Sequence, residues 1–230
     1  MDIDGTLTQP GAVLCPFALQ VLNAIKAQVV LITAQAESYA DKIGCNNFPN
    51  LVSEKGMTIR IDGGPVFRGS SPSVVADFIG EMKTHLASLT HSFVLNAKMA
   101  GYAVGFRQDV PANELASVKG LMVKQILKNS AFQLEETAGF IDLTLVRLSK
   151  ATALAKVRNY FPATSKWVAC GDSVTTDGPM LDAADKGIMV TNAYRDYPVL
   201  PRVEDMLTLL NWFGMVKAAS NDLSGALKWD

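Results

Sequence analysis

Histidine, cysteine and clustered basic residues are all scarce in this sequence of 230 residues. The two histidines, His85 and His91, stand apart from the other distinctive motifs, so we expect surface residues rather than metal ligands. Three widely spaced cysteines without a CxxC pattern argue against a disulfide framework or a zinc site and predict buried thiols. A formal net charge of -1, with no run of lysine or arginine, argues against binding to nucleic acid or to an anionic membrane.

Long apolar segments are also missing from the sequence. The longest apolar runs are strand-sized, well short of the ~20 residues needed to cross a bilayer. The first residues contain no basic and then apolar leader, so we expect a cytoplasmic protein. With 49% apolar and 19% charged residues, the composition is typical of a compact soluble protein. The length allows one large domain or two small ones, and we favour two.

Both ends of the chain carry the alternating strand and helix patterns of an α/β domain. Residues 29–32 and 166–170 are mainly apolar runs, which are typical of strands buried in a parallel sheet. Periodicity and turn residues predict the remaining elements. The expected helices are residues 15–26, 37–43, 150–160, 179–184 and 203–213, and the further strands are residues 51–52, 57–61 (followed by a turn at 62–64) and 188–190.

The pattern changes between residues 67 and 146, where the order helix, strand, strand occurs twice. The expected helices are residues 71–86 and 112–129, and the strands are residues 92–96, 102–108, 132–136 and 140–146. This order implies an antiparallel sheet with both helices on one face, which leaves the other face free to cover something. The predicted domains are an α/β core (1–66 and 147–216), an inserted α+β module (67–146) and a loosely held tail (217–230).

Acidic residues and a glycine end the first expected strand, at residues 2–6 (DIDGT). Residues i and i+2 of a strand point to the same side, so Asp2 and Asp4 would repel each other unless a cation or a shared proton intervenes. Thr33 and Asp172 follow other expected strands, and the carboxyl ends of parallel strands meet at one edge of a sheet. The residues expected to converge there are Asp2, Asp4, Thr33, Lys150, Asp172 and Asp177.

These side chains favour phosphoryl transfer. Oxygen ligands without histidine or cysteine select a hard cation, and Mg²⁺ is the first choice. Asp2 can attack phosphorus to form an aspartyl phosphate, while Asp4 protonates the leaving oxygen and then deprotonates the attacking water. Thr33 and Lys150 would hold the phosphoryl oxygens and offset the charge of the transition state.

The motifs resemble those of the haloacid dehalogenase (HAD) superfamily of phosphohydrolases. DIDGT at residues 2–6 is similar to the first family motif, Thr33 to the second, Lys150 to the third, and GDSVTTD at residues 171–177 to the fourth. The resemblance covers nearly the whole chain up to Phe213. It implies a Rossmann-like parallel-sheet core. The inserted module is similar to the C2B cap of type IIB sugar phosphatases, which include Cof-like and trehalose-phosphate phosphatase-like enzymes.

The resemblance implies a Mg²⁺-dependent phosphoric monoester hydrolase that acts on a sugar phosphate or a similar small phosphorylated metabolite. In the family, Mg²⁺ binds the side chain of the first aspartate, the backbone carbonyl of the second and an aspartate of the fourth motif. These correspond here to Asp2, Asp4 and Asp172, with Asp177 in support. The cap would close over the site, exclude bulk water and select the substrate.

Three features depart from the family pattern. Only Met1 precedes Asp2 where an apolar strand is usual, so either the sequence begins inside a longer chain or the central strand is missing. Residues 33–35 read Thr-Ala-Gln where Thr-Gly-Arg is frequent, which removes an arginine contact to substrate or cap. Ala151 follows Lys150 where glycine is common. Of the three, only the first threatens activity.

Four residues beyond the motifs are candidate substrate contacts. Lys98, Arg107 and Glu136 lie at or near expected cap strands, and Asn192 follows the last expected strand. Solvated charges on a sheet edge explain the first three equally well, and turn chemistry explains Asn192 equally well.

Two other functions remain open at this level. A phosphomutase of the phosphomannomutase type would need cap arginines that grip a second phosphate, and only Arg107 is an evident candidate. A non-catalytic protein that binds a phosphorylated metabolite is the other alternative, although the complete set of motif residues argues against it.

Overall fold

A computed structural model describes residues 1–8, 13–14, 22, 27–45, 48–137 and 139–190 of the chain. Several predictions fall wholly or mostly outside these residues. They are the helices at 15–26 and 203–213, the tail at 217–230, Cys15 and Asn192.

The core contains two hydrogen-bonded sheets. In the first, β1 and β2 are parallel, and β3 and β4 extend the sheet in antiparallel order. In the second, β9 and β10 are parallel. The strands are β1 (Leu31–Ile32), β2 (Leu51–Ser53), β3 (Thr58–Ile61), β4 (Gly64–Arg68), β9 (Val168–Gly171) and β10 (Lys186–Met189).

Residues 1–3 join these two sheets. The amide of Ile32 in β1 donates to the carbonyl of Met1 at 2.8 Å, and the amide of Asp2 donates to the carbonyl of Cys170 in β9 at 2.9 Å. The first residues therefore occupy the place between β1 and β9 that the sequence predicts for the first strand. Because the predicted strand-end residues follow β1 and β9 directly, three strand ends meet at one edge.

Apolar side chains pack on both faces of the core sheet. Leu31 and Leu51 belong to one buried cluster, whereas Ile32 and Val52 belong to another. Neighbouring residues of a strand point to opposite faces, so the sheet is buried on both sides, as the continuous apolar runs predict.

Among the described residues of the core, three helical segments flank the strand ends. They are α2 (Glu37–Ala40), which continues as a π-helical turn (Asp41–Cys45), α5 (Lys150–Arg158) and α6 (Val174–Ala183). Helix α5 begins at Lys150 as predicted. Ser149 Oγ accepts from the amide of Thr152 at 3.1 Å, and Thr152 Oγ1 accepts from the amide of Ser149 at 2.9 Å, which makes a capping box.

The predicted start of helix α6 at residue 179 is wrong by five residues. The hydroxyl of Ser173 accepts from the amide of Thr176 at 3.2 Å and caps a helix that begins at Val174. Pro179 therefore lies inside the helix, where its missing N–H removes one backbone hydrogen bond. This earlier start places Asp177 in the first turn of α6.

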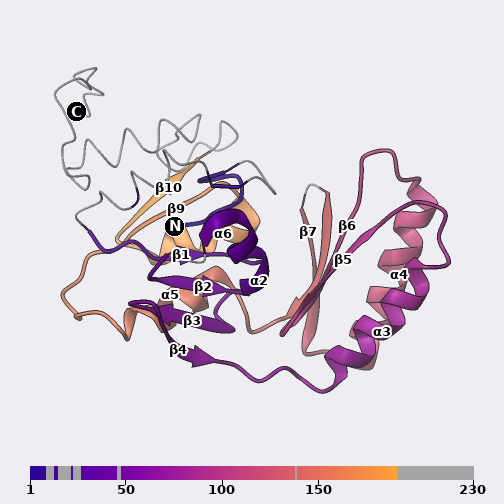
Figure 1. The fold of residues 1–230 in the computed structure, drawn as a ribbon, viewed down its shortest axis with the longest axis horizontal. Coiled ribbons are helices and arrows are strands. Elements are labelled where there is room, and N and C mark those ends of the chain that lie inside the picture. Colours follow the sequence, from indigo (N-terminus) through magenta and orange to yellow (C-terminus); the bar gives the residue numbers. More distant parts are fainter. Residues whose placement is uncertain (9–12, 15–21, 23–26, 46–47, 138, 191–230) are drawn as a thin grey trace.

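The inserted module contains a four-stranded antiparallel sheet in the order β5-β6-β8-β7. Helices α3 and α4 cover one face of this sheet, and the sheet lies between them and the core (Figure 1). This confirms the predicted architecture, although Ser73 rather than Ser71 precedes the first helix. The elements are α3 (Val74–Leu86), β5 (Val94–Lys98), β6 (Gly101–Gly105), α4 (Ala112–Lys128), β7 (Phe132–Thr137) and β8 (Phe140–Leu145).

The two histidines lie away from the strand ends, and the two described cysteines lie inside the core. Cys45 and Cys170 are buried free thiols, as predicted. His85 and His91 are in the module, where their rings bond to Ser117 and Glu114 of α4. Among the described residues, no helix is long and apolar enough to cross a membrane.

Candidate active site

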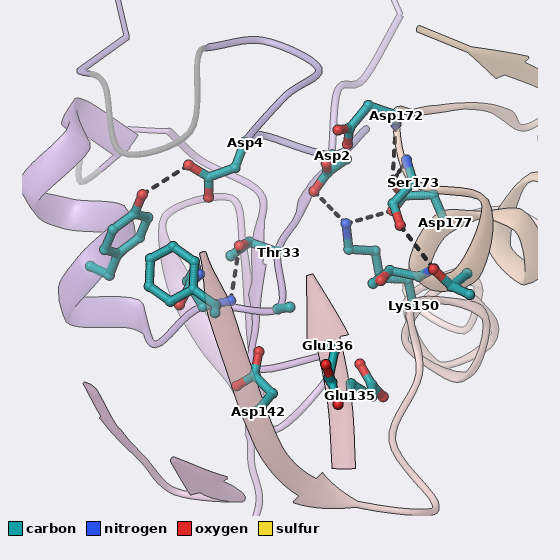
Figure 2. Close-up of a pocket in the computed structure, with 16 residues that line it drawn as sticks. Asp2, Asp4, Thr33, Glu135, Glu136, Asp142, Lys150, Asp172, Ser173 and Asp177 are labelled. Atoms are coloured by element: carbon teal, nitrogen blue, oxygen red, sulfur yellow. Dashed lines mark hydrogen bonds and ion pairs between the residues drawn. The ribbon is translucent and has the colours of Figure 1, made fainter. Parts of the chain in front are cut away.

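A buried lysine joins two carboxylates at the shared strand edge. Lys150 Nζ donates to Asp2 Oδ1 and to Asp177 Oδ1, at 2.5 Å in each case (Figure 2). The hydroxyl of Thr6 donates to the other oxygen of Asp2 at 3.3 Å. These residues come from the first segment of the chain, from α5 and from α6, so only the fold brings them together.

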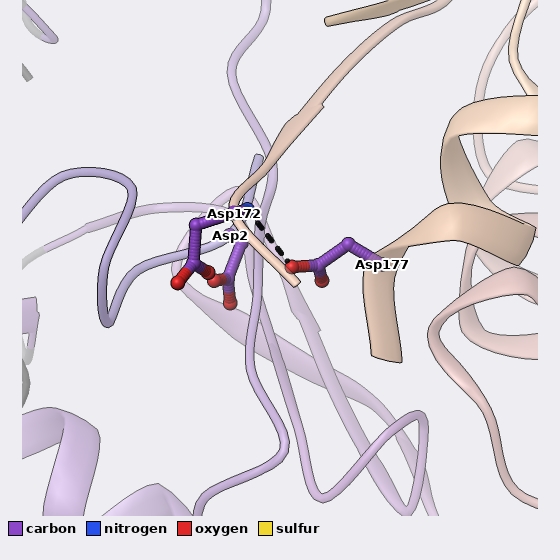
Figure 3. A group of neighbouring side chains, drawn as sticks. All are labelled: Asp2, Asp172 and Asp177. Carbon is purple, nitrogen blue, oxygen red and sulfur yellow. Dashed lines mark hydrogen bonds between the residues drawn. The ribbon is translucent and has the colours of Figure 1, made fainter. Parts of the chain in front are cut away.

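The loop between β9 and α6 folds Asp177 back toward the strand end. Asp177 Oδ2 accepts from the amides of Asp172 at 3.1 Å and Ser173 at 2.9 Å. The hydroxyl of Ser173 caps α6, so this serine stabilises the loop. Both histidines of the chain lie in the inserted module, so neither activates Ser173 as a nucleophile. Asp172 itself lies beside Asp2 (Figure 3).

Three carboxylates are grouped closely enough to share one cation. One oxygen from each of Asp2, Asp172 and Asp177 lies within 4.8 Å of the others. All the donors are hard oxygens, which suits Mg²⁺ better than a softer metal. The side chain of Asp4 is outside this group and accepts from the hydroxyl of Tyr39 at 2.8 Å. The residues present therefore fit a Mg²⁺ site, with the Asp4 carboxylate left for another role.

Burial perturbs the titration of this cluster. It raises the pKa of Asp2 to about 7, although Lys150 opposes the shift. Burial and then the charge of Asp177 also raise the pKa of Asp172. Burial alone would lower the pKa of Lys150, but its two carboxylate partners raise it above its usual value. The cluster carries more negative charge than one lysine offsets, and a divalent cation would relieve the excess.

Two glycines allow the close approach of these carboxylates. Gly5 has a φ of 82°, and a Cβ there would lie 2.1 Å from Asp172 Oδ2. A Cβ on Gly171 would lie 2.5 Å from the Cβ of Asp177. The glycines of the first and fourth motifs are therefore required by the packing of the site itself.

A Gly5→Ala substitution is expected to displace Asp172 and to weaken Mg²⁺ binding by about tenfold or more, because the added methyl group overlaps its carboxylate. Isothermal titration with Mg²⁺ measures the affinity, and urea unfolding monitors stability. The matched control is Gly80→Ala in helix α3, where a Cβ would meet no atom within 4 Å. Equal Mg²⁺ affinity in the Gly5 variant and the control would show that Gly5 is not needed to place the Asp172 carboxylate at the Mg²⁺ site.

The hydroxyl of Thr33 lies at the end of β1, as predicted. Its Oγ1 accepts from the amide of Gln35 at 3.0 Å, and the side chain is buried. Thr33 and Lys150 both line the same cavity as the acidic cluster. This placement allows both residues to face a group bound at the strand edge.

The cavity lies between the core and the inserted module and has a volume of about 370 Å³. Its core wall includes the predicted site residues, and its other wall comes from β7 and β8 (Figure 2). It is lined by Asp2, Asp4, Thr33, Ala34, Gln35, Tyr39, Glu135, Glu136, Phe140, Asp142, Lys150, Asp172, Ser173, Thr175, Thr176 and Asp177. The sheet of the module therefore covers the strand ends with its helix-free face.

The predicted substrate contacts of the module are only partly placed at this cavity. Glu136 lines it and pairs with Lys119 at 2.7 Å. Lys98 is buried and pairs with Asp142 at 2.5 Å, and it lines a different cleft. The side chain of Arg107 is 81% exposed and pairs with Asp109, so it does not lie on the cavity wall.

The polar residues of the cavity that sequence reasoning missed include Glu135 and Asp142 of the module and Tyr39 of α2. A signal existed for Asp142, because it is the one charged residue of strand β8. Tyr39 and Glu135 lie among ordinary helix and strand residues and offered no such contrast.

Comparison with protein-family models finds no match for the sequence, and comparison with curated proteins finds none either. Solved structures do match the fold along nearly the whole chain. A trehalose-6-phosphate phosphatase related protein has a TM-score of 0.70 at 16% identity, covering 94% of this chain and 96% of that one. A phosphatase of the HAD superfamily from Bacteroides thetaiotaomicron has a TM-score of 0.63 at 20% identity, covering 94% of both chains.

The chain therefore has the fold of HAD-superfamily phosphatases, as the four motifs predict. Among the solved structures with this fold, it is similar to trehalose-6-phosphate phosphatases. The C-terminal domain of the C. albicans trehalose-6-phosphate phosphatase has a TM-score of 0.71 at 15% identity, covering 94% of this chain and 91% of that domain. Identities this low concern the fold alone, so activity and substrate are argued from the site.

Proposed function

We propose that the protein is a Mg²⁺-dependent phosphomonoester hydrolase for a sugar phosphate or a similar small phosphorylated metabolite. The observation that carries the proposal is the buried Lys150, held between Asp2 and Asp177, next to Asp172 in a cavity covered by the inserted module. Burying several charged side chains together is unfavourable when the cavity holds no ligand. This cluster suits a bound cation together with a phosphate dianion.

Catalysis in this proposal proceeds through an aspartyl phosphate. A carboxylate oxygen of Asp2 attacks phosphorus, the bond from phosphorus to the ester oxygen breaks, and Asp4 gives that oxygen a proton. Water then attacks the phosphoryl group and gives a proton to Asp4, while the bond from phosphorus to Asp2 breaks. Inorganic phosphate leaves, and both aspartates return to their starting states.

The other residues hold the phosphoryl group during both steps. Thr33 and Lys150 donate hydrogen bonds to its oxygens, and Tyr39 orients the carboxyl group of Asp4. Asp2, Asp172 and Asp177 would hold Mg²⁺, with the backbone carbonyl of Asp4 as the family resemblance implies. When bound, Mg²⁺ would offset the negative charge that the nucleophile and the phosphate share.

The cavity wall from the module favours a substrate rich in hydroxyl groups. Glu135, Glu136 and Asp142 are hydrogen-bond acceptors there, and Phe140 offers an apolar face. Carboxylates accept bonds from sugar hydroxyls, and the lysines paired with these three are already engaged by them rather than open to a second anionic group. The same wall argues against the phosphomutase alternative, because Arg107, its candidate for gripping a second phosphate, lies elsewhere.

Phosphate release from a panel of sugar monophosphates tests the proposal. We expect release that requires Mg²⁺ and stops with EDTA, and we expect sugar monophosphates to be hydrolysed faster than bisphosphates. An Asp2→Asn variant purified in the same way separates the proposed route from adventitious phosphatases, and circular dichroism confirms that the protein is folded. If the folded protein with Mg²⁺ releases no phosphate from any member of the panel, the hydrolase proposal fails in favour of a binding function.

A further inference from the structure

The turn between β2 and β3 has an unusual backbone. Glu54, Lys55 and Gly56 are successive residues in the left-handed region, with φ values of 48°, 54° and 96°. Left-handed conformations are unfavourable for residues other than glycine and persist where surrounding contacts demand them. Both charged side chains are also buried, with 5% and 4% of their surfaces exposed. A strained turn with two buried charges requires an explanation.

The backbone of this turn is bonded to the loop that carries Thr33. The amide of Lys55 donates to the carbonyl of Thr33 at 3.0 Å, and the amide of Glu54 donates to the carbonyl of Gln35 at 2.9 Å. The turn therefore supports the loop that, in our proposal, holds the phosphoryl group.

The same turn also contacts the helix that begins with Lys150. Lys156 Nζ donates to the carbonyl of Gly56 at 3.1 Å, and a Cβ on Gly56 would lie 3.2 Å from the Cα of Ala153. Two of the segments that line the phosphate end of the cavity thus meet at one turn.

The side chains of the turn leave the core and bind the inserted module. Glu54 Oε2 accepts from the amide of Ala100 at 3.0 Å, and this bond is buried. Lys55 Nζ forms an ion pair with Glu135, which lines the cavity. Ala100 lies in the turn between β5 and β6, directly before β6, and Glu135 lies in β7, the edge strand at the other side of the sheet. Attachment at these two separate places restrains the sheet against rotation as well as displacement.

We propose that Glu54, Lys55 and Gly56 form a latch that seats the module over the phosphate site. Glu54 and Lys55 are positioning residues, because they act through the Thr33 loop and through Glu135. The catalytic part of this inference rests on the proposed hydrolase function. A substrate that reaches Glu135 benefits from the seated module, whereas a small phosphate ester that stays at the strand edge does not.

Hydrogen exchange of the Ala100 amide tests the latch without any substrate. In the full-length protein, Glu54→Ala removes the acceptor of this amide, so its exchange rate is expected to rise about tenfold or more by NMR. Lys55→Met should raise exchange in β7, because it removes the partner of Glu135 while keeping a long apolar stem. The control is Lys119→Met, which removes the partner of the neighbouring Glu136 within the module and should leave Ala100 unchanged.

Kinetics tests the consequence for the substrate. For the best sugar phosphate, Lys55→Met is expected to lower kcat/KM about tenfold or more, while p-nitrophenyl phosphate changes less than about threefold. The losses caused by Lys55→Met and Glu135→Gln should be less than additive in the double variant, because the two residues share one contact. A Lys128→Met control removes an exposed ion pair with Glu81 between the two helices of the module and should change hydrolysis of neither substrate.

The two measurements separate the latch from the hydrolase. Unchanged exchange at Ala100 in Glu54→Ala, or an equal loss of kcat/KM for both substrates in Lys55→Met, would overturn the latch. Faster exchange in a protein that hydrolyses no phosphate ester would support the latch and reject the hydrolase.

Discussion

Replacing Asp2 with asparagine is expected to lower the rate of phosphate release by at least about 10³-fold, because an amide cannot form the aspartyl phosphate. Asparagine keeps the shape of the side chain, and Lys150 keeps Asp177 as its partner. The melting temperature should therefore stay close to that of the parent protein. Steady-state kinetics and acid-quench trapping of phosphorylated protein measure the two consequences.

The matched control for this prediction is Asp77→Asn, which makes the same chemical change on the exposed surface of α3. It should leave both the rate and the phosphoprotein yield unchanged. An Asp2→Asn variant that keeps more than about a tenth of the activity would remove Asp2 from the role of nucleophile. The acid and base role of Asp4 would then also have to be assigned again.

Replacing Lys150 with methionine is expected to abolish hydrolysis and to destabilise the fold by about 3–5 kcal/mol at neutral pH, because it leaves two buried carboxylates without their cation. Urea unfolding measures the loss. Added Mg²⁺ should recover more stability in this variant than in the parent protein, since the ion replaces the missing positive charge. EDTA should remove that recovery.

The free energy of unfolding of the Lys150→Met variant should change with pH in one direction. Without the lysine, the pKa of Asp2 in the folded state rises further above its unfolded value of 3.8, so the folded protein binds more protons than the unfolded one. Its stability should fall as pH rises from about 4 toward neutrality, and the deficit against the parent protein should be smallest at low pH. A Lys166→Met control removes an exposed partner of Asp185 and should change stability by less than about 0.5 kcal/mol. A deficit that is the same at every pH would contradict the buried-charge explanation.

Local patterns predicted most elements of the fold because their physical causes are local. The continuous apolar runs marked the buried strands, and the repeated order of helix, strand, strand marked the inserted module. The predicted start of α6 is wrong because proline indicates a helix start at residue 179, whereas the hydroxyl of Ser173 caps the helix earlier. Proline and a capping serine are both start signals, and the sequence does not rank them.

The residues of the candidate site also fall into two groups, those that a local pattern marks and those that only the fold brings to the site. Asp2, Asp172 and Lys150 stand in short motifs at predicted strand ends or helix starts, where local spacing makes them visible. Glu135 and Lys55 gain their roles from contacts with segments far along the chain, so no local pattern marks them. Lys98 and Arg107, for which the sequence allowed substrate contact and a solvated charge equally, do not line this cavity.

The sequence by itself determined the acidic motifs, the alternating core and the inserted module, because residue type, spacing and periodicity express these features directly. Only the tertiary structure decided which side of the module faces the site, and which of its charges reach the cavity. It also decided that the strained turn at residues 54–56 joins the Thr33 loop, helix α5 and two separate places on the module's sheet. Such contacts depend on the packing of distant segments, and a residue's neighbours in sequence carry no record of that packing.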